Sequence, residues 1–122
     1  MAVRTSRRDA QPTQRELRRW DALVDEIRRA GFFRRGSLLR LYNQCGTPGC
    51  RCHADPLQRH GPYWQWTRKV HGKTVTARLA PEQAELLQTW LDTGRRLDQT
   101  LAELDALSIA ITDRLLTART RQ

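Results

Sequence analysis

The chain has 122 residues, 39% of them hydrophobic, and carries 22 lysines and arginines against 13 acidic residues, for a formal net charge of +9. A chain of this length forms one domain, or a small domain with a helical extension, and its four tryptophans argue against a wholly disordered chain. It has no apolar run long enough for a transmembrane helix, and its basic N-terminus lacks the apolar segment of a signal peptide, so we expect a cytoplasmic protein with reduced thiols.

The positive charge is concentrated in the first two thirds of the chain. Residues 1–80 carry 17 Lys and Arg against 6 Asp and Glu, whereas residues 81–122 carry 5 against 7. Arginine greatly outnumbers lysine, which biased genome composition would explain, but such a bias does not explain the excess of arginine over glutamate. Because a dense basic segment attracts polyanions, nucleic acid is the expected partner.

The first elements are a basic flexible arm over residues 1–11 and an amphipathic helix over residues 12–31. Thr13 and Glu16 have the spacing of a capping box, and Gly31 is a natural stop. Apolar side chains recur at three- and four-residue steps, at Leu17, Trp20, Val24 and Ile27. This stripe is typical of a helix that packs on the rest of the protein.

Residues 34–80 form a Cys-rich loop followed by a β-hairpin module. The stretch from Ser37 to Tyr42 fits either a short strand or a helical turn, since periodicity cannot decide over so few residues. Glycines and prolines then punctuate residues 45–62, which predicts a loop without a regular element.

The loop contains every cysteine of the chain, in the pattern Cys45-x4-Cys50-x-Cys52. Three thiolates and a histidine suit a structural zinc ion, and His60 closes the loop better than His53, which adjoins Cys52. The predicted zinc ligands are therefore Cys45, Cys50, Cys52 and His60. Reduced structural thiols and a redox-active pair are the alternatives.

A hairpin is predicted around His71-Gly72, which suits a tight two-residue turn between two strand-forming runs. In that register one face is a core face, with Trp64, Trp66, Val75, Ala77 and Leu79, and with Arg68 near the tip. The other face pairs Gln65 with Arg78, Thr67 with Thr76 and Lys69 with Thr74. A two-stranded ribbon of this kind fits the major groove of B-DNA, although antiparallel ribbons also expose polar faces to water alone.

Residues 81–118 are predicted to form one long helix, with Pro81 in its first turn. A heptad seam of coiled-coil character runs along it, through Leu87, Trp90, Gly94, Leu97, Leu101, Leu104, Ser108, Ile111 and Leu115. The seam either pairs with a second copy or folds back on the first helix. We favour a homodimer through residues 87–115, because the first helix is too short to cover the whole seam.

The motifs RGSL, CGxPxCxC and HGPY resemble those of a family of small bacterial and archaeal proteins with a domain of unknown function. The resemblance rests on Gly36, Ser37, Leu38, Cys45, Gly46, Pro48, Cys50, Cys52, His60, Gly61, Pro62, Tyr63, Gly72 and Lys73. It implies no established activity, and it suggests an accessory role near mobile elements, with a transposase or recombinase. The hairpin is also similar in outline to the arm-type DNA-binding sheet of phage-like tyrosine recombinases, from which it departs in spacing and in lacking an assured third strand.

These observations predict an α+β protein: an N-terminal helix, a zinc-knuckle-like Cys-rich loop, a β-hairpin and a long C-terminal helix. We expect a small zinc-stapled DNA-binding protein that serves mobile DNA or transcription. We do not expect an enzyme, because a catalytic zinc needs a nearby general base and Asp55 is the one acid close to the cysteines. The predicted nucleic-acid contacts are Arg34, Arg35, Gln65, Thr67, Arg68, Lys69, Lys73 and Arg78. The alternatives are a coiled-coil adaptor with a structural zinc knob, or an RNA-binding protein whose aromatic residues stack on bases.

Overall fold

The structure, a computed structural model, describes residues 11–43, 46–55 and 59–120. The chain divides into two compact units, one formed by Met1–Gly31 with Arg95–Gln122 and the other by Phe32–Gly94. Helix α4, Pro81–Thr120, contributes its first turns to the second unit and the rest of its length to the first. The predicted α+β class is therefore confirmed.

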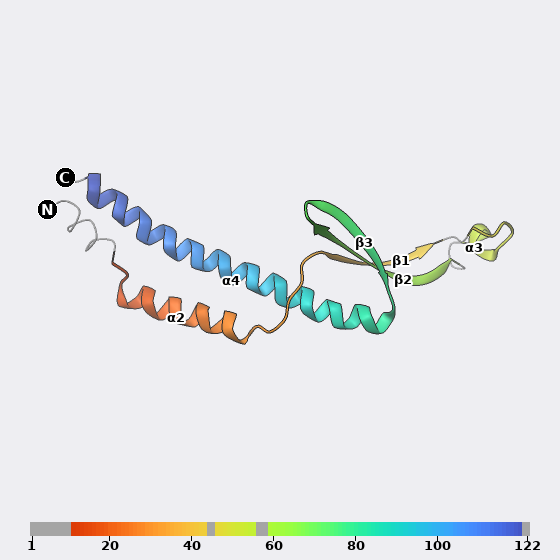
Figure 1. Cartoon of the computed structure of the whole chain (residues 1–122), viewed down its shortest axis with the longest axis horizontal. Helices are drawn as coiled ribbons and strands as arrows, with labels where there is room; N and C mark the ends of the chain where they lie inside the picture. Colours follow the sequence, from red (N-terminus) through yellow and green to blue (C-terminus); the bar gives the residue numbers. More distant parts are fainter. Residues whose placement is uncertain (1–10, 44–45, 56–58, 121–122) are drawn as a thin grey trace. The chain divides into compact units, whose positions relative to one another are not determined.

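The first unit pairs helix α2, Gln14–Arg29, with the C-terminal part of α4 (Figure 1). The predicted capping box is present, because the Thr13 hydroxyl accepts the Glu16 backbone N–H and the Glu16 carboxylate accepts the Thr13 N–H. Leu23, at the centre of α2, is 0% exposed. Polar contacts hold the two helices elsewhere, through the pairs Arg19–Glu103 and Arg114–Glu16.

The second unit is built on a three-stranded antiparallel sheet in the order β1-β2-β3, with β1 Ser37–Asn43, β2 His60–Val70 and β3 Lys73–Leu79 (Figure 1). The hairpin register is confirmed at every pair, from Trp64 opposite Leu79 to Val70 opposite Lys73. His71 and Gly72 both have positive φ, as a tight two-residue turn requires.

The predicted hairpin is part of a larger sheet, because β1 adds a third strand. Residue pairs run from Ser37 opposite Thr67 to Leu41 opposite Tyr63, and the register shifts before Asn43 pairs with His60. Two strands alone are only marginally stable, and a third strand provides the additional ladder of hydrogen bonds and packing. Of the two possibilities left open for residues 37–42, the strand is the one observed.

The first turns of α4 supply buried apolar side chains to the second unit, namely Ala84, Leu87 and Leu91. Trp66 and Leu79, from one face of the sheet, line a small cavity together with Leu87 and Trp90 of α4. The even-numbered residues of β2 therefore form the core face, as the hairpin register predicts. No helix within the described residues is long and apolar enough to cross a membrane.

Gly94 lets the chain segment before β1 pass against α4. The Arg34 N–H donates to the Trp90 carbonyl oxygen at 3.1 Å, and a Cβ built on Gly94 would clash with the Arg34 carbonyl oxygen. The heptad seam is thus interrupted at Gly94 by a close backbone approach.

Candidate functional site

The Cys-rich segment brings Cys50, Cys52 and His60 together. One ligand atom from each of these residues lies within 4.8 Å of the other two, and the Cys50 Sγ is 3.2 Å from the His60 Nε2. Cys52 is 1% exposed, so its thiol points into the protein. A tetrahedral zinc ion with bonds of ~2.0–2.3 Å places neighbouring ligand atoms roughly 3.3–3.8 Å apart, so small side-chain adjustments would bring these three atoms into its coordination sphere.

A short helix explains how two cysteines separated by one residue reach the same point. Helix α3, Arg51–Ala54, has Cys50 at its N-cap and Cys52 in its single turn. The expectation that residues 45–62 contain no regular element is therefore wrong. The turn formers cluster before Cys50 and after Asp55, and the intervening four residues are free to close hydrogen bonds, including that from the Asp55 N–H to the Arg51 carbonyl oxygen at 3.1 Å.

The remaining predicted ligand, Cys45, lies outside the described residues. His60 begins β2 and pairs with Asn43 at the end of β1, two positions before Cys45 in the sequence. His53 is exposed on α3 and is not part of the cluster. Two thiolates and an imidazole suit a thiophilic metal ion.

The face of the sheet opposite to the core face is mostly polar and lacks acidic side chains. Directly opposed residues of an antiparallel pair project to the same face, and two side-chain contacts mark that face here. The Lys69 Nζ donates to the Thr74 Oγ1 at 2.7 Å, and the Thr67 and Thr76 hydroxyl oxygens lie 3.3 Å apart. We call this surface the open face; its positions are Ser37, Leu39, Leu41, Tyr63, Gln65, Thr67, Lys69, Thr74, Thr76 and Arg78.

Four of the predicted nucleic-acid contacts thus share one surface, namely Gln65, Thr67, Lys69 and Arg78. Lys73 is exposed beside the hairpin turn. The sequence did not place Leu39 and Leu41 on this face, because their side of the sheet became defined only once β1 was seen to pair with β2.

The three remaining predicted contacts are placed differently. Arg68 is on the core face, with its guanidinium carbon 4.2 Å from the centre of the Trp66 ring. Arg34 lies over the same ring at 4.7 Å, and Arg35 lies over Phe33 at 5.2 Å.

Cation–aromatic contacts recur throughout the second unit. Arg78 lies 4.3 Å from the centre of the Tyr63 ring on the open face, and Arg40 lies over both Tyr42 and Trp64 on the core face. A guanidinium stacked on a ring keeps its N–H edges available for in-plane hydrogen bonds. The sequence signal for these contacts is the abundance of arginine among aromatic residues, which does not by itself pair one residue with another.

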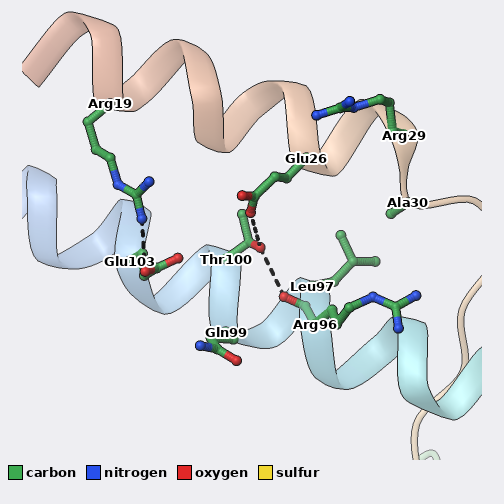
Figure 2. Close-up of a pocket in the computed structure, with 9 residues that line it drawn as sticks. All are labelled: Arg19, Glu26, Arg29, Ala30, Arg96, Leu97, Gln99, Thr100 and Glu103. Atoms are coloured by element: carbon green, nitrogen blue, oxygen red, sulfur yellow. Dashed lines mark hydrogen bonds and ion pairs between the residues drawn. The ribbon is translucent and has the colours of Figure 1, made fainter.

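The first unit contains a polar groove of about 480 Å³ between α2 and α4 (Figure 2). Arg19 pairs with Glu103 in it, and the Thr100 hydroxyl lies within hydrogen-bonding distance of both the Glu26 carboxylate and the Arg96 carbonyl oxygen. Arg29, which also lines the groove, pairs with Asp25 on its own helix. These charges are thus neutralised within the chain, and the groove is a weak candidate for a charged ligand.

The fold and its Cys/His cluster define a small α+β domain with a potential metal site. Residues 11–89 match the family model described as a domain of unknown function (DUF6788), so the chain belongs to that family. None of the curated proteins is significantly similar to this chain, and neither is any of the solved structures.

Proposed function

We propose that this protein binds duplex DNA through the open face of its sheet, and that a zinc ion held by Cys45, Cys50, Cys52 and His60 braces the sheet at the start of β2. The observation that carries the proposal is the open face itself, which presents Gln65, Thr67, Lys69 and Arg78 with no acidic side chain among its positions. Lysine, arginine, glutamine and threonine are the side chains that contact phosphates and base edges in the major groove.

The size of the sheet also supports this assignment. Neighbouring strands lie ~4.8 Å apart, so the axes of the outer strands are roughly 10 Å apart, a separation comparable with the ~12 Å width of the B-DNA major groove. Charge acts in the same direction, because residues 34–80 contain 9 Lys and Arg and one Asp. An accessory role at mobile DNA is the biological setting that the motif resemblance suggests.

The test is a salt titration with a fluorescently labelled, mixed-sequence DNA duplex followed by anisotropy. The logarithm of affinity falls linearly with the logarithm of salt concentration, with a slope proportional to the number of phosphates neutralised. The double variant Lys69→Ala/Arg78→Ala should bind more weakly, and the magnitude of its salt slope should be smaller by about 2. Arg15→Ala/Arg28→Ala, which removes the same charge from the exposed side of α2, should leave the slope unchanged.

Two results would contradict the proposal. One is a wild-type protein that does not bind the duplex even at low salt, which would favour the protein-adaptor alternative. The other is a slope that falls equally in both double variants, because it would show a response to net charge alone. If the protein binds single-stranded RNA more tightly than the duplex, the open face would instead be assigned to RNA recognition, with Tyr63 as the stacking residue.

A further inference from the structure

Two arginines share one tryptophan on the core face of the sheet. The guanidinium carbons of Arg34 and Arg68 lie 4.7 Å and 4.2 Å from the centre of the Trp66 ring. The two residues are distant in sequence, since Arg34 precedes β1 and Arg68 is near the end of β2. Two like charges are thus held against one ring, at a cost in electrostatic repulsion.

The contact is fixed by the backbone around it. Trp66 donates its indole N–H to the Arg35 carbonyl oxygen at 3.3 Å, and the Arg34 N–H donates to the Trp90 carbonyl oxygen at 3.1 Å. Gly36 has φ +129°, and a Cβ there would come within 2.6 Å of the Trp66 Nε1. The segment before β1 can therefore lie directly over Trp66 because residue 36 has no side chain.

The charge of the pair is not balanced by a carboxylate. Among the residues that the structure describes, neither Arg34 nor Arg68 forms an ion pair, and the Nε and Nη1 of Arg68 are buried without a hydrogen-bond partner. A buried charged donor without an acceptor is costly, and native proteins usually satisfy such donors with a water, an ion or a ligand. Here the local charge specifies the sign of the missing partner as negative.

We infer that Arg34 and Arg68 bind one phosphate group, with Trp66 as the positioning residue that orients both guanidinium groups. A guanidinium that stacks through its flat face directs its N–H edge sideways, in the geometry that bidentate bonding to phosphate oxygens needs. The backbone at Arg34 is held in place, but its side chain is exposed and has room to turn toward an anion.

A phosphate fits this site better than the carboxylate of an acidic peptide. Two guanidinium groups supply two positive charges and several donors, which a phosphate with its larger set of acceptor oxygens satisfies more completely than one carboxylate does. Lys69 on the open face and Arg68 on the core face also place cations on both sides of the hairpin end. Both walls of a DNA groove are lined with phosphates. The assignment to a phosphate of the DNA backbone rests on the proposed function, and free inorganic phosphate has the same chemistry.

The test combines two probes on the full chain. In the first, inorganic phosphate is titrated into ¹⁵N-labelled protein while the arginine Nε–Hε resonances are followed by NMR. Arg68 should shift and saturate, whereas Arg28, an exposed arginine of α2, should not. In the second, the duplex salt titration is repeated with Arg34→Gln/Arg68→Gln. Loss of one phosphate contact should make the magnitude of the salt slope smaller by about 1.

A third variant tests the positioning role of the ring. Trp66→Leu keeps both arginines and should weaken the phosphate titration, and Trp66→Tyr should restore part of it because an aromatic face is regained. If Trp66→Leu does not fold, as judged by circular dichroism, Arg68→Lys serves instead. This variant keeps the charge but loses the planar fork, so the phosphate shift should be reduced.

The outcomes separate the two proposals. If the duplex binds and Arg34→Gln/Arg68→Gln leaves its salt slope unchanged, the phosphate site is wrong and the open-face proposal stands. If the duplex does not bind but inorganic phosphate shifts the Arg68 resonance saturably, the phosphate site stands and DNA binding is wrong. A stronger Arg68 response to a polyglutamate peptide than to phosphate would also overturn the phosphate assignment.

Discussion

Arg114 and Glu16 form a bidentate ion pair across 98 positions of sequence. The Arg114 Nη2 lies 2.6 Å from the Glu16 Oε1, and the Arg114 Nη1 lies 2.8 Å from the Glu16 Oε2. The same Glu16 carboxylate accepts the Thr13 backbone N–H at the N-terminus of α2. One carboxylate therefore both caps α2 and ties it to α4, which makes it the main polar contact of the helix pair.

This arrangement predicts a stability that depends on pH. The hydrogen bonds from Arg114, followed by the bond from the Thr13 backbone, lower the pKa of Glu16 from 4.5 to about 2. Because the pKa is lower in the folded state, the stabilisation is fully present above pH 4.5 and is lost as the pH falls toward 2. Glu16→Gln should therefore be less stable than the wild type at neutral pH, and the difference should shrink through that window in urea unfolding experiments.

Asp21→Asn is the matched control, because Asp21 is an exposed acid on the same helix. Its stability relative to the wild type should change much less between pH 4.5 and 2. An equal pH dependence in the two variants would mean that the general loss of carboxylate charge, and not the pair with Arg114, destabilises the protein at low pH.

Gly94→Ala should destabilise the protein although Gly94 lies inside a helix. Alanine normally stabilises a helix interior by about 1 kcal/mol relative to glycine. Here the added Cβ would clash with the Arg34 carbonyl oxygen and displace the segment that leads into β1. We expect a net loss of about 1–3 kcal/mol in the free energy of unfolding, as for other overpacked sites.

Ser108→Ala, at an exposed position of the same helix, is the control for intrinsic helix propensity and should be neutral or slightly stabilising. Chemical denaturation of the two variants side by side checks this prediction. A stabilised Gly94→Ala protein would show that residue 34 does not press on α4.

The local elements were predictable from sequence because their signals are short-range. Thr13 and Glu16 form a capping box three residues apart, and His71-Gly72 alone sets the register of the hairpin. Pro81 starts α4 as its fixed φ favours. Each of these signals rests on neighbouring residues whose geometry the backbone determines.

The features that sequence did not reveal depend on long-range pairing. Residues 37–43 become a strand because β2 offers a partner edge, and that edge is invisible in seven residues of sequence. Likewise, the stacking of Arg34 on Trp66 needs Gly36 and Gly94 to let the chain pass closely. Of the candidate metal ligands, Cys50, Cys52 and His60 are brought together as spacing predicted, because a loop of seven residues between Cys52 and His60 can close on one ion.

Purified protein should contain one zinc ion per chain, measured by native mass spectrometry without added metal. Cys52→Ser should remove the metal and lower the melting temperature, because the ligand cluster connects α3 to the start of β2. His53→Ala and His71→Ala are controls, since both histidines are exposed and lie outside the cluster; they should retain the metal. If the folded wild-type protein binds no zinc, the predicted zinc site is wrong and these cysteines have a structural role only.

We propose a homodimer through the heptad seam of α4. The exposure of seam residues in the first unit indicates which of them would form the interface. Helix α2 contacts α4 through Thr100, Glu103 and Arg114. The seam residues Leu97, Ser108 and Ile111 also line cavities together with residues of α2. Leu101 and Leu115 of the seam stay 49% and 38% exposed. Apolar positions beside an existing helix contact are typical of helices that pack in larger bundles.

Leu101→Gln/Leu115→Gln should therefore convert a dimer into a monomer in sedimentation equilibrium experiments, with little loss of helical signal because both side chains are already accessible within one chain. Leu39→Gln is the matched control, since Leu39 is also 49% exposed but lies on the open face of the sheet. It should leave the dimer intact. A wild-type chain that sediments as a monomer at all concentrations tested would instead mean that the fold-back of α2 on α4 is the only pairing the seam makes.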